Sequence, residues 1–215
     1  EYLNKKLPII PCKEKKPKNA QRQKKDFKLE DFKPGDNMGL KLKDFTDIDI
    51  DNPKALPFIN KYIQPCSALF GREKQMPMHQ LFKGQNKHKK FALHDDLEKY
   101  FKNNIHGATI IECRSGVDKQ TIVPGSVIGG EKIEWKVFEG ISPYPGNLFK
   151  DISKVAFATA LSILYPKTGN RDDYVYAIAC ILARHTKWKD WEIDEFILHL
   201  AEYSGDEEAS MQAIA

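Results

Sequence analysis

Three aspartates alternate with isoleucines in residues 45–53, and these are the side chains best placed to do chemistry together. Side chains on a β-strand point to opposite faces with a period of two, so the isoleucines are predicted to enter a core. Asp47, Asp49 and Asp51 would then share the other face, where neighbouring like charges repel one another. A divalent metal with oxygen ligands relieves this repulsion most directly, whereas a solvated strand face is the simpler alternative.

Further charged side chains suited to the same chemistry follow in residues 70–79 and 110–115. They are Arg72, Lys74, His79, Glu112 and Arg114. Nucleotidyl transfer uses two divalent ions, held by shared carboxylates, to stabilise the attacking and leaving oxygens, and cationic side chains to hold the triphosphate. The set therefore predicts nucleotide-binding cations beside a metal centre, although a lone histidine on an apolar strand is often an ordinary core residue.

Short apolar runs bounded by turn residues predict the strands that carry these side chains. The expected strands are residues 7–11, 37–42, 45–51, 67–70, 79–82, 109–114 and 120–123, the last two paired with each other. Asn52 is a good N-cap and Pro53 suits the first helical position, so a helix is expected from there to Tyr62. The aspartates would thus lie at a strand-to-helix junction. A further helix is expected over residues 94–103.

The pattern changes beyond residue 146. Apolar residues recur with helical spacing in residues 151–164, 173–185 and 191–203. We therefore predict an α+β fold, with a catalytic domain over residues 1–146 and a helical bundle over residues 147–215.

Bulk properties narrow the function classes. The chain has 215 residues and a formal net charge of +4, which permits a polyanionic partner without requiring one. Its four cysteines form no Cys-x-x-Cys pair, so no zinc is expected. No stretch approaches the ~20 apolar residues of a membrane span, and no signal peptide is visible. We expect no membrane partner, a cytoplasmic location with the nucleus left open, and, without an initiator Met, a segment of a longer polypeptide.

Basic residues cluster in residues 13–25 and recur in the helical region. The candidates for contacts to DNA phosphates, an attraction that weakens with salt, are Lys15, Lys16, Lys18 and Arg171. Solvated loops would produce the same pattern.

The order of the motifs resembles the archaeo-eukaryotic primase superfamily, in particular the primase-polymerase domains of plasmids, phages and integrated elements. Members carry Asp-x-Asp on an apolar strand, a second motif that ends in histidine, and a third with an acidic residue after apolar ones. The matching residues are Asp49-Ile50-Asp51 (or Asp47-Ile48-Asp49), His79 and Glu112. The run Phe70-Gly71-Arg72 is similar to another family element, and residues 169–172 resemble part of the helix bundle that often follows.

This resemblance implies an RRM-like catalytic core with a mixed sheet, followed by a small all-α bundle. It also implies a DNA primase or DNA polymerase that joins nucleoside triphosphates on single-stranded DNA in the replication of a plasmid, virus or mobile element. Two Mg²⁺ or Mn²⁺ ions would be held by Asp49, Asp51 and Glu112, with Asp47 accessory. The nucleotide's phosphates would contact His79, with Arg72, Lys74 and Arg114 beside it. A C-terminal helicase domain is expected in the full-length protein.

Two other interpretations stay open. Pro77-Met78 replaces the small hydroxyl residue that the family has before its histidine, which suits a catalytically silent DNA-binding module of a replication initiator. An aspartyl-phosphate phosphatase also places Asp-x-Asp after an apolar strand, but it leaves His79 and Glu112 unexplained. An EF-hand fails, because Asn52 and Phe58 stand where its loop needs glycine and glutamate.

Overall fold

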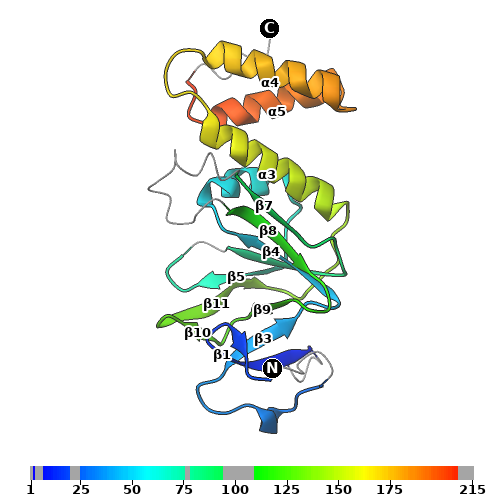
Figure 1. Cartoon of the computed structure of the whole chain (residues 1–215), viewed down its shortest axis with the longest axis vertical. Helices are drawn as coiled ribbons and strands as arrows, with labels where there is room; N and C mark the ends of the chain where they lie inside the picture. The colour runs from blue at the N-terminus through cyan, green and yellow to red at the C-terminus, as the bar shows by residue number, and fades with distance from the viewer. Residues whose placement is uncertain (1, 3–6, 20–24, 76–77, 94–108, 208–215) are drawn as a thin grey trace.

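Two antiparallel sheets and four α-helices make up the part of the chain that this computed structural model describes, which is residues 2, 7–19, 25–75, 78–93 and 109–207. The predicted α+β fold class is confirmed. In Figure 1 the smaller sheet, the larger sheet and the helices follow one another along the long axis of the molecule.

The larger sheet has seven strands in the order β10-β11-β5-β6-β4-β8-β7. Their bounds are Val127–Ile128 (β10), Glu131–Phe138 (β11), Ala68–Arg72 (β5), His79–Lys83 (β6), Phe45–Ile50 (β4), Thr109–Ser115 (β8) and Lys89–Ala92 (β7). Each neighbouring pair is antiparallel. The predicted mixed sheet is therefore wrong for these strands, because a mixed sheet needs some neighbouring strands that run parallel and each pair here runs antiparallel.

The smaller sheet has four strands in the order β2-β1-β3-β9. Their bounds are Lys16–Pro17 (β2), Ile9–Lys13 (β1), Asn37–Lys41 (β3) and Gln120–Ile122 (β9). The predicted pairing of residues 109–114 with 120–123 is wrong, since β8 pairs with β4 and β7 while β9 pairs with β3. The turn between them is tied to the backbone of Leu42, which accepts from Gly116 N–H at 3.1 Å and donates to Lys119 at 3.0 Å, so the chain crosses to the other sheet.

Four of the five predicted helices are confirmed, with small shifts at their starts. Asn52 caps the first one through a hydrogen bond from Lys54 N–H at 3.0 Å, and the chain makes one 3₁₀ turn, Pro53–Ala55, before α1, Leu56–Tyr62. The later helices are Leu148–Leu164 (α3), Arg171–His185 (α4) and Asp190–Tyr203 (α5). The helix expected over residues 94–103 lies outside the described residues. Among the helices described, none has the length and apolar content that crossing a membrane requires.

Strand β4 lies in the interior of the larger sheet, and all six of its residues are buried. As predicted, Ile48 and Ile50 enter an apolar cluster with the helices. On the opposite face, Phe45 and Leu81 join Leu40 of the smaller sheet in a second cluster. The larger sheet is thus enclosed by helices on one face and by the smaller sheet on the other.

The apolar cluster on the helical side is continuous from β4 and β8 through α3 to α5. It crosses the expected domain boundary at residues 146 and 147, which lies directly before α3. The division into two domains stays a prediction.

Candidate metal centre

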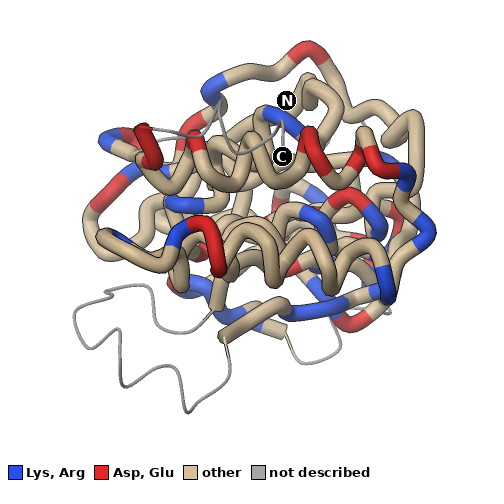
Figure 2. The backbone as a smooth tube through the Cα atoms, turned by 90° about the horizontal axis from the view of Figure 1, so that it is seen from above, with Lys and Arg blue, Asp and Glu red and all other residues tan. Residues whose placement is uncertain are grey.

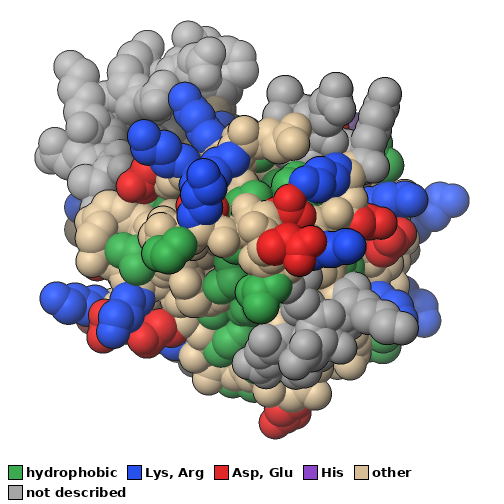
Figure 3. Space-filling model, turned by 90° about the horizontal axis from the view of Figure 1, so that it is seen from below, with side chains coloured by type: hydrophobic (Ala, Val, Ile, Leu, Met, Phe, Trp, Pro, Cys, Tyr) green, Lys and Arg blue, Asp and Glu red, His purple; other side chains and the backbone are tan. Residues whose placement is uncertain are grey.

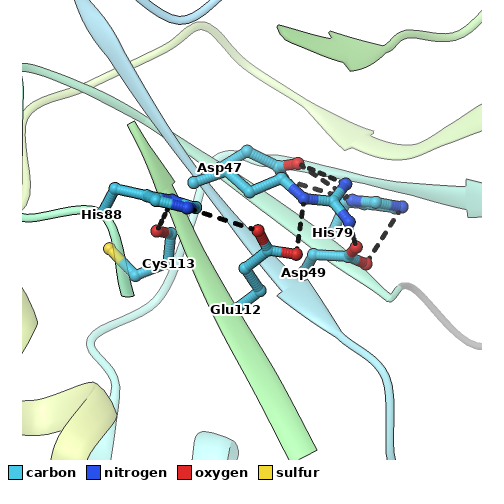
Figure 4. A network of polar contacts seen from close by, with 7 residues as sticks. Asp47, Asp49, His79, His88, Glu112 and Cys113 are labelled. Carbon is cyan, nitrogen blue, oxygen red and sulfur yellow. Dashed lines mark hydrogen bonds and ion pairs between the residues drawn. The ribbon is translucent and has the colours of Figure 1, made fainter. Parts of the chain in front are cut away.

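Three neighbouring strands bring acidic and basic side chains onto one face of the larger sheet. Asp49 on β4 stands opposite His79 on β6 and opposite Glu112 on β8. Side chains directly opposite each other in antiparallel strands project to the same face, so these three converge on the side that the smaller sheet covers. Figure 4 shows the carboxylates of Asp49 and Glu112 on the same side of the ribbon, with the His79 ring beside Asp49.

The sequence-predicted metal ligands form a compact acidic triad. Asp49, Asp51 and Glu112 each offer an oxygen, and the three oxygens lie within 4.8 Å of one another. Asp51 follows β4 directly, and its backbone N–H donates to the carbonyl of Ile110 on β8 at 3.1 Å, which holds it beside Glu112. Clustered carboxylate oxygens are the ligands that Mg²⁺, Mn²⁺ and Ca²⁺ prefer. The triad therefore suits a divalent cation.

Asp47, the expected accessory ligand, lies outside this triad. Its carboxylate is fully buried, and both of its oxygens lie 3.2 Å from Nδ1 of His79. Burial alone would raise the pKa of Asp47, but the charge and hydrogen bond of His79, with the charge of Arg114, lower it below its ordinary value. Asp47 is thus held as a carboxylate under the site, where it orients the histidine.

The same pair explains the charge of His79. Burial alone would lower the pKa of this imidazole, but the charge and hydrogen bond of Asp47, with the charge of Asp49, raise it above the ordinary value for histidine. The Phe70 ring stacks on the imidazole, with centroids 4.6 Å apart and planes 3° from parallel. The Nε2 atom of His79 lies 3.5 Å from a carboxylate oxygen of Asp49. The pairing therefore favours the protonated form of His79, whose ring is held at the edge of the triad.

Asp49 and Asp51 are deprived of water to different extents. Burial raises the pKa of Asp49 to about 6, and the charges of Asp47 and Asp51 add to this, against the attraction of His79 and Arg114. Burial also raises the pKa of Asp51. A bound cation would favour the ionised form of both groups.

Arg114 on β8 links the carboxylates. Its guanidinium forms an ion pair with Asp49, its Nε donates to Glu112 at 3.0 Å, and its Nη1 lies 3.9 Å from Asp47. In this structure Arg114 is the main counter-charge of the triad. A divalent cation would compete with it for the oxygens of Asp49 and Glu112.

A cleft of about 420 Å³ opens between the two sheets at Asp49 and Asp51 of the triad, with Glu112 beside its lining. Its polar lining includes Lys15, Asp49, Asp51, Arg72, Gln75, His79, Arg114 and Thr121. Apolar walls come from Ile122 of β9, Ile128 of β10 and Ile133 of β11. The site is thus completed by elements that follow Glu112 by up to about twenty residues, which the separate motifs did not show.

The remaining predicted cations are placed unevenly. Arg72 lines the cleft and forms an ion pair with Glu131 at 2.5 Å, whereas Lys74 is exposed in the loop after β5 and is not among the lining residues. Lys15 lines the cleft as well. Of the predicted nucleotide-binding residues, Arg72, His79 and Arg114 therefore line the cleft, and Lys74 does not.

The other DNA-binding candidates lie away from the triad. Lys16 is exposed on β2, and Lys18 forms an ion pair with Asp36. Figure 3 views the end of the molecule that carries the smaller sheet, where basic and acidic side chains lie close together with apolar ones between them. Arg171 begins α4, far along the chain, and pairs with Asp206 at 3.2 Å. It borders a separate hollow of about 500 Å³.

His88 was missed by sequence reasoning. Its Nε2 lies 3.8 Å from Glu112, and its ring nitrogen Nδ1 lies 3.0 Å from the carbonyl oxygen of Cys113. Its place in the basic run of residues 87–90 was a signal only for surface charge. The position of His88 beside β8 follows from the pairing of β7, which begins at the next residue, with β8.

No protein-family model matches the sequence, and no curated protein matches it. The cleft and the Glu112 carboxylate beside it combine three carboxylates that suit divalent ions with a histidine and an arginine that suit phosphate.

Proposed function

We propose that the cleft is the active site of a metal-dependent nucleotidyltransferase, a DNA primase or polymerase that joins nucleoside triphosphates on a single-stranded DNA template. The observation that carries this proposal is the row in which Asp49 stands between His79 and Glu112 on adjacent strands. With Asp51, the row offers a carboxylate centre for metals on one side and a cation for phosphate on the other.

The strand order supports the same proposal. Strands β4, β5, β6 and β8 are ordered β5-β6-β4-β8 in the sheet, and α1 follows the first of them. The first strand is therefore central, between the third and the fourth. This is the arrangement expected of the RRM-like core that the sequence resemblance implies, with α3, α4 and α5 as the helical bundle behind it.

Asp49, Asp51 and Glu112 would hold the metals, which fit an all-carboxylate site of Mg²⁺ or Mn²⁺. When bound, two such ions stabilise the attacking and leaving oxygens of a phosphoryl transfer. The pairing with Asp47 raises the pKa of His79 and favours its charged form, so it suits contact with a phosphate better than proton abstraction. Lys15 and Arg72 on the cleft wall add positive charge for the triphosphate.

Extension of a primed single-stranded template tests the proposal. The unaltered chain is given nucleoside triphosphates with Mg²⁺, Mn²⁺ or EDTA, beside Asp49→Asn and Glu112→Gln. Extension that needs metal and is lost in both variants is expected. The matched controls are Asp44→Asn and Glu139→Gln, exposed carboxylates outside the cleft lining, which should extend normally. Normal extension by Asp49→Asn would overturn the metal mechanism.

One observation favours the second candidate, a catalytically silent DNA-binding module of a replication initiator. Arg114 already neutralises Asp49 and Glu112, so the acidic row does not need a metal to be stable. In that case the chain binds single-stranded DNA with the same affinity in EDTA and in Mg²⁺, and no template is extended. The extension assay and a DNA titration together separate the two candidates.

A further inference from the structure

Helix α4 has one packed side and one unpartnered side. Val175, Ile178 and Leu182 are buried against the other helices. In Figure 1 α4 lies at the end of the molecule opposite the smaller sheet, and Figure 2 looks down on this end, where the helices lie alongside each other. The side of α4 that points away from its buried residues faces solvent.

That outer side is apolar in its middle and charged at its ends. Tyr176 is 73% exposed and Ile181 is 49% exposed, and between them lie the small residues Ala177 and Cys180. At 3.6 residues per turn these four side chains, with Asp173 and Arg184, fall within an arc of about 140° opposite the buried side. We call this set of six residues the α4 stripe. Large exposed apolar residues that gather on one helix face mark an interaction surface.

The α4 stripe is symmetric about its own middle. Asp173 and Arg184 are equally far from the midpoint between Ile178 and Ala179, and so are Tyr176 and Ile181, and Ala177 and Cys180. Two copies of the helix packed antiparallel about a twofold axis at this midpoint would therefore place each residue against its complement. Asp173 would meet Arg184 of the second copy, and Tyr176 would meet Ile181 of the second copy.

Charge complementarity continues one residue further. The first turn of α4 contains Asp172 and Asp173, and the last turn contains Arg184 and His185. Within the described part of the chain, neither Asp173 nor Arg184 forms an ion pair. Small residues at the crossing point let two helices approach to about 8–10 Å between their axes.

We propose that the α4 stripe binds a second copy of this chain, giving a twofold dimer with antiparallel α4 helices. One helix face per partner is at the small end of specific interfaces, so the dimer is reversible and forms at micromolar or higher concentration. The contact lies on the helical end of the molecule, and the cleft lies between the two sheets. Both clefts of the dimer therefore stay open.

Sedimentation over a concentration series tests the proposal with charge reversals. The unaltered chain should shift from monomer mass toward dimer mass as its concentration rises to about 300 µM, a range set by the small interface. Asp173→Arg sets like charges against Arg184 of the second copy, and Arg184→Asp does the same with Asp173, so each variant alone should stay monomeric. The double variant restores opposite charges and should dimerise again.

Several outcomes would overturn this dimer. They are a monomeric chain at every concentration, single variants that still dimerise, and a double variant that stays monomeric. Circular dichroism checks that each variant is folded, and Ile181→Glu, which inserts a charge in the apolar middle, gives a second monomeric variant if one reversal unfolds. Loss of single-stranded DNA binding in Arg184→Asp, with no change of mass, would assign the surface to nucleic acid instead.

Discussion

Arg114 stands opposite Asp47 in the β4–β8 ladder, but its guanidinium reaches along the sheet to form an ion pair with Asp49. Its Nε also donates to Glu112 at 3.0 Å. One protein cation therefore contacts two of the three carboxylates that a metal would use. The arrangement stabilises the acidic row without metal, and under the proposed function the arginine would compete with a metal for these oxygens.

Arg114→Gln is expected to bind Mn²⁺ about tenfold more tightly than the unaltered chain when no nucleotide is present, which corresponds to about 1.4 kcal/mol. The competing cation is removed, whereas three carboxylates remain. Titration of Mn²⁺ followed by its paramagnetic resonance signal measures the change. Nucleoside triphosphate binding should weaken in the same variant, because a phosphate contact is lost.

Arg184→Gln is the matched control, since that arginine is exposed on α4 and lies outside the cleft lining. It should leave both affinities unchanged. Unchanged or weaker Mn²⁺ binding in Arg114→Gln would show that the arginine does not compete for the triad.

Asp47 and Asp49 are two residues apart, but loss of charge is expected to destabilise the fold much more at Asp47 than at Asp49. Asp47→Asn breaks the pair between the fully buried Asp47 and the partly buried His79, so it should cost about 3–5 kcal/mol of unfolding free energy. Asp49→Asn removes a charge that burial already disfavours, so its cost should stay near 1 kcal/mol or below. Urea unfolding in EDTA at pH 7 measures both.

In metal binding the ranking of the two variants should be the reverse of their ranking in stability. Asp49→Asn is expected to lose Mn²⁺ binding while staying folded, whereas Asp47→Asn should bind Mn²⁺ wherever enough of it is folded. A stable Asp47→Asn chain that has lost the metal would make Asp47 a ligand, as the sequence alone suggested, and would contradict its supporting role.

The sequence predicted what depends on short-range pattern. The alternation in residues 45–51 identified a strand with buried isoleucines, and Asn52-Pro53 marked the helix start, because a period of two and a cap are local properties. The acidic triad was expected from the resemblance that the order of the motifs carries, and the structure brings its three carboxylates together.

The sequence did not predict which strands pair with each other in the two sheets. Nothing near Ser115-Gly116 indicates that the turn binds the backbone of Leu42 and sends β9 to the other sheet, since that contact joins residues more than seventy apart. The pairing of β9 with β3 brings Thr121 to the cleft, and the separate pairing of β7 with β8 brings His88 to Glu112. The full burial of Asp47, which sets it apart from the triad, was likewise not visible in the sequence.

Metal affinity should depend on pH through Asp49. Because burial raises the pKa of Asp49 to about 6 in the metal-free chain, this carboxyl is largely protonated at pH 5 and ionised at pH 7. A metal needs the ionised form, so Mn²⁺ affinity should rise from pH 5 to 7 and level off above, with up to about one proton released per ion from this group at the lower pH. Calorimetric titrations in buffers of different ionisation enthalpy measure that release. A pH-independent affinity in this range would contradict the assignment.

The Asp47–His79 pair should give the metal-free chain a stability advantage confined to a pH window. The pKa of Asp47 is lowered on folding, so its contribution is present above about pH 4 and is lost as the pH falls through the folded value. The pKa of His79 is raised on folding, so its contribution is full below about pH 6.5 and is lost as the pH rises through the folded value. The two effects together predict a maximum between these limits.

The comparison of the unaltered chain with His79→Gln isolates this advantage, because the titration of most other groups cancels in the difference. Urea unfolding in EDTA from pH 4 to 9 should show the largest loss in His79→Gln at about pH 5–6 and a shrinking loss at higher pH, as the imidazole becomes neutral. His185→Gln, exposed on α4, is the matched control and should show no such profile. A loss in His79→Gln that grows with pH would mean that the neutral imidazole is the form that folding favours, and that His79 is not the cation on which phosphate binding depends.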